Sequence, residues 1–152
     1  MSNPSATLEQ TELTLQSVIE VLIDGQKGFQ KIGEELKDPD LKLFFLQESL
    51  KRAEFRGNIE TVLHQQGVHD IEEFGTATAG LQRAWSGLKA KLGGGDRSLL
   101  ETAEQDEHAA AKAYTEALHK ELPFPVRQLL ASQANHIRLF HDYVMELRRD
   151  AR

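Results

Sequence analysis

The apolar residues of this chain recur every three or four positions over four long segments. This spacing gathers the apolar side chains on one side of an α-helix. It predicts helices over about residues 8–36, 39–66, 97–121 and 125–149. Each segment has more than about 20 residues, so each helix should be about 30 Å long or longer. The apolar positions include Leu15, Ile19, Leu22, Phe29, Phe55, Ile59, Leu100, Ala110, Tyr114, Val126, Leu130, Ile137 and Val144.

Prolines mark the starts of two of these helices. Asp38 is a suitable N-cap, and Pro39 suits the first helical position after it. Two of the connections are only a few residues long, so each joins a pair of antiparallel neighbours. The connection over about 67–95 is much longer and has its own apolar pattern, which predicts a short extra helix over 76–92.

Two helical hairpins joined by one long crossover are typical of ferritin-like four-helix bundles. We therefore expect an all-α fold with a single domain over residues 1–152. The expected architecture is a ferritin-like four-helix bundle with the short fifth helix in its crossover.

Several polar residues interrupt the apolar stripes. They are Gln26; Glu48 and Arg52; Glu104 and Glu107; Gln133, His136 and His141. Gln26 and Glu48 are each 11 residues from Lys37 at the first predicted turn. Equal counts along an antiparallel hairpin mean equal height, so we expect a polar layer across the middle of the bundle.

A buried hydrogen-bonded network without metal is the first interpretation of this layer. Buried charges require partners, and Glu48 and Arg52 have the i, i+4 spacing of a helical ion pair. His141 is expected to bond to a carboxylate such as Glu107. The predicted members of the network are Gln26, Glu48, Arg52, Glu107, Gln133 and His141.

A di-iron or other metal centre is the alternative interpretation. The carboxylate-bridged template needs a Glu from each of two helices and Glu-x-x-His from each of the other two. This chain instead has Gln26 on the first helix, Glu48-x-x-Lys51 on the second and Gln133-x-x-His136 on the fourth. Arg52 adds a permanent positive charge. We therefore expect no metal cofactor; the candidate ligands otherwise are Glu48, Glu104, Glu107, His136 and His141.

Composition narrows the possible functions. The chain has no cysteine, which excludes disulfides, thiolate metal sites and a cysteine nucleophile. Its net charge of −6 argues against nucleic acid as a partner. There is no secretory signal pattern and no apolar run long enough to span a membrane, so we expect a cytoplasmic protein without a membrane partner. No phosphate-binding loop or serine nucleophile motif occurs.

Several short motifs resemble an uncharacterised bacterial family of ferritin-like four-helix bundles. They are Asp24-Gly25-Gln26-Lys27-Gly28-Phe29, Lys37-Asp38-Pro39-Asp40-Leu41-Lys42, the crossover segment from Gly80 to Lys89, the segment from Ala113 to Leu118, and His141-Asp142. The resemblance implies the bundle fold and no established activity. The glutamate usual in the first motif of that family is Gln26 here, so one carboxylate of a metal site is missing.

These observations favour a non-enzymatic bundle that acts by self-association or as a stress-related accessory protein. The alternatives are a metal-binding protein that handles iron or oxygen, and a binder of a small molecule between the helices. We expect a homo-oligomer, most simply a dimer, because Phe74 and Trp85 in the crossover could contact a partner subunit.

Overall fold

The computed structural model describes residues 4–67 and 95–150. These residues form four α-helices and no strand, which confirms the expected all-helical class. The predicted helix over 76–92, together with Phe74 and Trp85, lies outside the described residues. The helices are α1 (Pro4–Glu35), α2 (Pro39–Gln65), α4 (Gly95–Leu118) and α5 (Phe124–Asp150).

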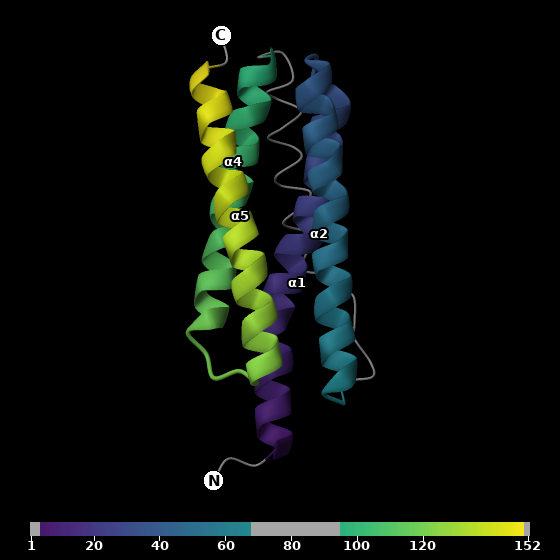
Figure 1. Ribbon diagram of the computed structural model, residues 1–152, viewed down its shortest axis with the longest axis vertical. Helices are drawn as coiled ribbons and strands as arrows, with labels where there is room; N and C mark the ends of the chain where they lie inside the picture. Colours follow the sequence, from purple (N-terminus) through teal and green to yellow (C-terminus); the bar gives the residue numbers. More distant parts are fainter. Residues whose placement is uncertain (1–3, 68–94, 151–152) are drawn as a thin grey trace.

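The four helices lie side by side as a bundle (Figure 1). α1 and α5 run in one direction, and α2 and α4 run in the opposite direction. α1 packs against α2 and α4, and α5 packs against α4 and, less extensively, against α2. Every packed pair is therefore antiparallel, and α2 ends at the opposite end of the bundle from the start of α4.

The ends of α2 follow directly from the local sequence. The Asp38 side chain accepts hydrogen bonds from the backbone N–H groups of Asp40 (2.9 Å) and Leu41 (3.2 Å), and Pro39 follows it, so the predicted N-cap is confirmed. At the other end Gly67 has a φ of 100°, a left-handed conformation that glycine adopts without strain.

Asp96 connects two distant parts of the bundle. Its carboxylate oxygens accept hydrogen bonds from the backbone N–H groups of Lys37 (3.0 Å) and Asp38 (3.2 Å) in the turn between α1 and α2. Helix α4 already begins at Gly95, two residues before the predicted start. The Asp96 side chain thus ties the start of α4 to the turn between the first two helices.

An arginine completes the connection between α4 and α5. Helix α4 ends at Leu118, three residues before the predicted end, because the backbone tightens into turns at His119 and Lys120. The Arg127 guanidinium donates to the carbonyl oxygens of Leu118 (2.9 Å) and Lys120 (2.6 Å). These bonds satisfy carbonyl groups that have no partner within the helix.

The core consists of two apolar clusters. The cluster nearer the α1–α2 turn contains Phe29, Ile32, Leu36, Phe45, Leu99, Leu100, Ala103, Phe140 and Val144. The other contains Leu15, Val18, Ile19, Leu22, Ile23, Phe55, Ile59, Leu63, Ala110, Tyr114, Ala117, Val126, Leu130 and Ile137. Along α2 and α4, the buried side chains of Glu48, Arg52 and Glu107 fall between the two clusters.

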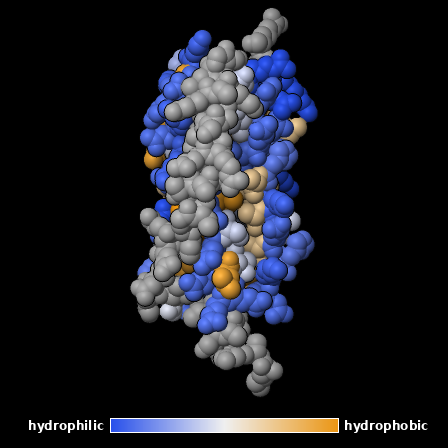
Figure 2. All heavy atoms as spheres, turned by 180° about the vertical axis from the view of Figure 1, so that it is seen from behind, coloured by the Kyte–Doolittle hydropathy of each residue, from blue (hydrophilic) through white to orange (hydrophobic). Residues whose placement is uncertain are grey.

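The described part of one face of the bundle is mainly polar. Seen from behind, the described side chains are mostly hydrophilic, with a few separate apolar ones (Figure 2). Among the described residues, no helix has the length and apolar character needed to cross a membrane.

Replacing Asp96 tests the connection between α4 and the α1–α2 turn. Asp96→Ala should lower the free energy of unfolding by about 1–3 kcal/mol, because it removes the acceptor of two backbone N–H groups. Urea unfolding followed by circular dichroism measures this. Glu116→Ala, at an exposed position of the same helix, should change stability by less than about 0.5 kcal/mol. Equal effects of the two variants would show that the Asp96 bonds contribute nothing.

Candidate functional site at the centre of the bundle

Arg52 is the centre of the polar layer. Its side chain is wholly buried, although arginine is rarely buried without a partner. Its Nε donates to Oε2 of Glu48, one turn earlier on α2, over 2.7 Å. Its Nη2 forms an ion pair with Oε1 of Glu107 on α4 over 2.8 Å. One guanidinium is therefore held between two carboxylates from two helices.

Aromatic rings enclose the same guanidinium. The central carbon of the Arg52 guanidinium lies 5.0 Å from the centre of the Phe29 ring on α1 and 5.4 Å from that of Phe140 on α5. A cation near an aromatic ring is attracted by the negative potential of the ring face. All four described helices thus contact this one side chain.

The electrostatics of the pair follow from its burial. Burial alone lowers the pKa of Arg52, but the charges of Glu107 and Glu48 outweigh it and raise that pKa above its ordinary value. Burial raises the pKa of Glu107, and the charge of Arg52 opposes this rise only in part. Loss of either partner would leave the other charge without compensation in a site closed to water.

His136 is the histidine that joins the network. Its Nε2 lies 2.9 Å from Oε1 and 3.0 Å from Oε2 of Glu48. We predicted that His141 would bond to Glu107. Instead Nε2 of His141 has no hydrogen-bond partner, and its Nδ1 lies 3.5 Å from a carboxylate oxygen of Asp142. The rotation of α5 about its axis explains the difference, because it turns His136 toward α2 and His141 toward α4.

The side chains of Gln26 and Gln133 do not bond to the charged groups of the network, although the sequence predicts both as members of it. Gln133 accepts a hydrogen bond from the Tyr114 hydroxyl (2.7 Å) and donates to the carbonyl of Phe55 (3.1 Å), so it bonds to neither Arg52 nor a carboxylate. Gln26 contributes its backbone carbonyl, which accepts from Ser49 Oγ over 2.6 Å. Burial raises the pKa of Tyr114, which keeps its hydroxyl protonated as a donor.

Two carboxyl groups near this layer were not predicted. Burial and the nearby Glu20 raise the pKa of Asp24 to about 6. Burial and the charges of Glu107 and Asp24 raise that of Asp106 to about 7. Both residues lie at the edges of their helical stripes, so periodicity gave little indication of their burial. Asp24 does stand in the first of the short motifs, directly before Gly25.

The candidate metal ligands do not meet at one point. Those ligands are Glu48, Glu104, Glu107, His136 and His141. Glu48 binds Arg52 and His136, and Glu107 is paired with Arg52. Glu104 pairs with Arg148 of α5 instead. Among the described residues, three possible ligand atoms come within 4.8 Å of one another only where Glu104 and His141 meet His108, beside the central layer.

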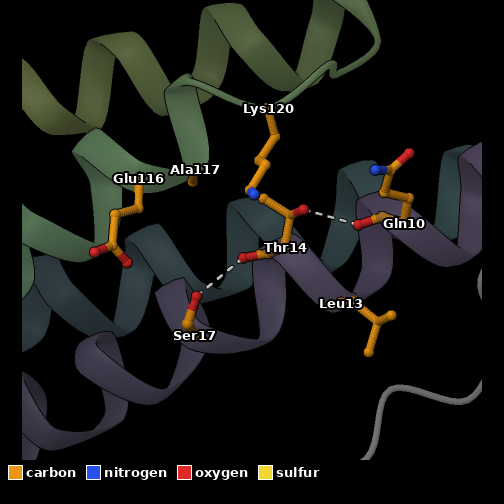
Figure 3. Close-up of a pocket in the computed structure, with 7 residues that line it drawn as sticks. All are labelled: Gln10, Leu13, Thr14, Ser17, Glu116, Ala117 and Lys120. Atoms are coloured by element: carbon orange, nitrogen blue, oxygen red, sulfur yellow. Dashed lines mark hydrogen bonds between the residues drawn. The ribbon is translucent and has the colours of Figure 1, made fainter.

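A surface hollow of about 340 Å³ lies between α1 and the end of α4 (Figure 3). Its lining residues are Gln10, Leu13, Thr14, Ser17, Glu116, Ala117 and Lys120. The hydroxyl groups of Thr14 and Ser17 donate to carbonyl oxygens of their own helix, and the Lys120 side chain extends toward Thr14. The described residues thus offer no buried, unpartnered polar group to a ligand here.

A comparison with protein families finds one match. Residues 10–120 match the model of a domain of unknown function (DUF2383). No curated protein matches the chain.

Removing Arg52 tests whether the network holds the fold. Arg52→Ala should lower the free energy of unfolding by about 3–5 kcal/mol, because it leaves Glu48 and Glu107 buried without a cation. Arg56→Ala is the matched control: Arg56 lies on the same helix and pairs with Glu60 over 2.8 Å, but both side chains are partly exposed. Its loss should cost about 1 kcal/mol or less.

A triple variant separates lost charge pairing from lost packing. Arg52→Met combined with Glu48→Gln and Glu107→Gln should recover much of the stability lost in Arg52→Met alone, as measured by urea unfolding. If Arg52→Ala lowered the free energy of unfolding no more than Arg56→Ala does, the network would not contribute to the stability of the fold.

The raised pKa of Asp24 predicts that the stability of the fold depends on pH. Its pKa rises from 3.8 to about 6 on folding, so its contribution to stability is full below pH 3.8 and is lost as the pH rises through about 6. Asp24→Asn should therefore be more stable than the natural chain at pH 8, by on the order of 1 kcal/mol after allowance for solvent screening.

Urea unfolding at a series of pH values measures the Asp24 effect. The charged groups that act on Asp24 are Glu20 and Lys27 on α1 and Asp106 on α4. The difference between the natural chain and Asp24→Asn should vanish near pH 4. A difference that does not change with pH would contradict the assignment to Asp24.

Proposed function

We propose that this chain, which belongs to the family of the domain of unknown function DUF2383, is a non-enzymatic, ferritin-like bundle that acts by forming a homodimer. The proposal rests on the geometry of its helices. The helix directions support the ferritin-like part of this proposal. α2 ends and α4 begins at opposite ends of the bundle, as in folds with one long crossover (Figure 1).

The burial of Arg52 is the observation that carries the non-enzymatic part. Ferritin-like proteins build their metal centres from side chains that point into the middle of the bundle. Here the middle holds a guanidinium with no exposed surface, two carboxylates paired with it, and two aromatic rings against it. A cation placed there would meet the charge of Arg52. The function therefore belongs to the outside of the molecule.

Helix α2 has a second apolar stripe on the side away from the core. Leu43 is 57% exposed and Leu50 is 72% exposed. The stripe, which we call the outer α2 stripe, consists of Leu43, Leu50, Ala53 and Gly57. Leu46 lies beside it but packs against Gly33 of α1. The members of the stripe follow one another after seven, three and four residues, which is the spacing of a helix face that packs against another helix.

The outer α2 stripe is complementary to itself. In an antiparallel pair of α2 helices centred on Leu50, the large Leu43 of one copy lies against Gly57 of the other. Space is open around Gly57, where an added Cβ would meet no atom within 4 Å. A two-fold axis joins the same surface patch of both subunits, and this match of large to small residues favours a second copy of this chain as the partner.

Light scattering on the natural and variant chains tests the dimer. The natural chain should have the mass of a dimer, and Leu50→Glu should be a monomer because two carboxylates would meet at the axis. Leu139→Glu, at an exposed apolar position of α5, is the matched control and should remain dimeric. Circular dichroism checks that both variants are folded. A monomeric natural chain, or a dimeric Leu50→Glu variant, would refute the proposed interface.

Cysteine cross-linking tests the antiparallel arrangement, since the chain has no cysteine of its own. Leu50→Cys should form a disulfide between two copies, because their Cα atoms face each other across the axis. Leu43→Cys alone should not, because the two copies of residue 43 are about 20 Å apart along the helices. Leu43→Cys together with Gly57→Cys should cross-link. Efficient cross-linking of Leu43→Cys alone would indicate a parallel pair instead.

A further inference from the structure

A group of metal-ligating side chains lies where α4 packs against α5, beside the central layer. Glu104 and His108 are one turn apart on α4, and His141 comes from α5. One carboxylate oxygen of Glu104 and one ring nitrogen of each histidine all lie within 4.8 Å of one another. The two imidazole rings are in edge-to-face contact, with their centres 4.7 Å apart.

His141 has a ring nitrogen that is available to bind a metal. Its Nδ1 lies 3.5 Å from Oδ1 of Asp142, whereas its Nε2 is buried and has no hydrogen-bond partner. In the neutral tautomer that is protonated at Nδ1, this Nε2 carries a free electron pair. A buried nitrogen with a free electron pair is costly unless something binds it, because buried polar groups are normally satisfied.

We propose that Glu104, His108 and His141 bind one divalent transition-metal ion of the zinc class. Two imidazoles and one carboxylate are a ligand set that zinc, cobalt and nickel accept, and three protein ligands leave a coordination position for water. Bonds of about 2.0–2.2 Å would bring the three ligand atoms to roughly 3–4 Å from one another. The ligands must therefore close by about 1 Å, which rotation of the exposed His108 side chain can supply.

This site differs from the central metal centre that is the alternative interpretation of the polar layer. That centre would require Glu48, Glu107 and His136, which the network holds. It would also place the metal against Arg52. The site proposed here shares with it only Glu104 and His141.

Arg148 competes with the metal. Its guanidinium pairs with Glu104, and its side chain is 43% exposed. Metal binding requires this guanidinium to turn into solvent, which its exposure permits. Removing it should therefore tighten metal binding, although it removes an ion pair from the fold.

Titration of Zn²⁺ into the full-length chain, free of tags and stripped of metal, tests the site by calorimetry. The natural chain should bind one ion, and Co²⁺ should give the visible absorption of a site with nitrogen and oxygen ligands. His108→Ala, His141→Ala and Glu104→Ala should each weaken binding by more than about tenfold. Arg148→Ala should bind more tightly than the natural chain.

His119→Ala is the matched control, because it removes an exposed histidine beyond the end of α4 and should leave the affinity unchanged. His108 is exposed, so the His108→Ala variant keeps the test valid if His141→Ala fails to fold. Absence of saturable binding, equal losses in His119→Ala and His108→Ala, or weaker binding in Arg148→Ala would each overturn the proposal.

Discussion

The buried charge of Arg52 constrains the whole arrangement of the bundle. A guanidinium with no exposed surface is stable only where carboxylates reach it, and only one of its two carboxylates lies on its own helix. The other, Glu107, must come from α4, so α2 and α4 have to be set in height and rotation to within the reach of a side chain. His136 extends the network to α5, since its Nε2 lies within hydrogen-bond distance of both Glu48 carboxylate oxygens. A slide of α2 or α4 by one turn would separate Glu107 from Arg52 and leave a buried charge unpaired, at a cost of several kcal/mol.

This constraint explains the division of the core into two apolar clusters. Hydrophobic packing alone tolerates exchanges among similar apolar side chains, because many combinations fill the same volume. A charged layer between the clusters does not, since each of its members has particular partners. A bundle with four apolar faces could slip in register, whereas one crossed by Glu48, Arg52 and Glu107 has one register in which all three are paired. The layer thus contributes specificity of packing, as buried polar residues do in some other helical assemblies.

The features that the sequence predicts well are those determined within one helix. The N-cap at Asp38 and the Glu48–Arg52 pair depend on residues at most a turn apart, and both are present. Counting from the first turn also placed Gln26 and Glu48 at one height, and Ser49, next to Glu48, donates to the Gln26 carbonyl. What the sequence could not provide is the rotation of each helix about its axis. That rotation decides whether His136 or His141 meets the carboxylate, and it turns Gln133 toward Tyr114 rather than Arg52. The hydrogen bond that Asp96 accepts from the distant α1–α2 turn depends on how α4 packs against the rest of the bundle, and no local sequence pattern predicts this.

Two arginines of the same bundle show how burial decides which carboxylate a metal can use. Arg52 holds Glu107 where neither group touches water, and separating them would leave a buried charge, at a cost of about 3–5 kcal/mol. Arg148 pairs with Glu104 where the arginine side chain is partly exposed. An exposed ion pair is worth about 1 kcal/mol or less, because water solvates the two charges when they separate. A cation at the proposed site would therefore meet far less resistance from Arg148 than a cation at the centre would meet from Arg52. The same reasoning argues against a metal at the centre of the bundle and for the proposed site at its α4–α5 edge, so a closed charged interior and a metal at the edge are compatible in one small protein.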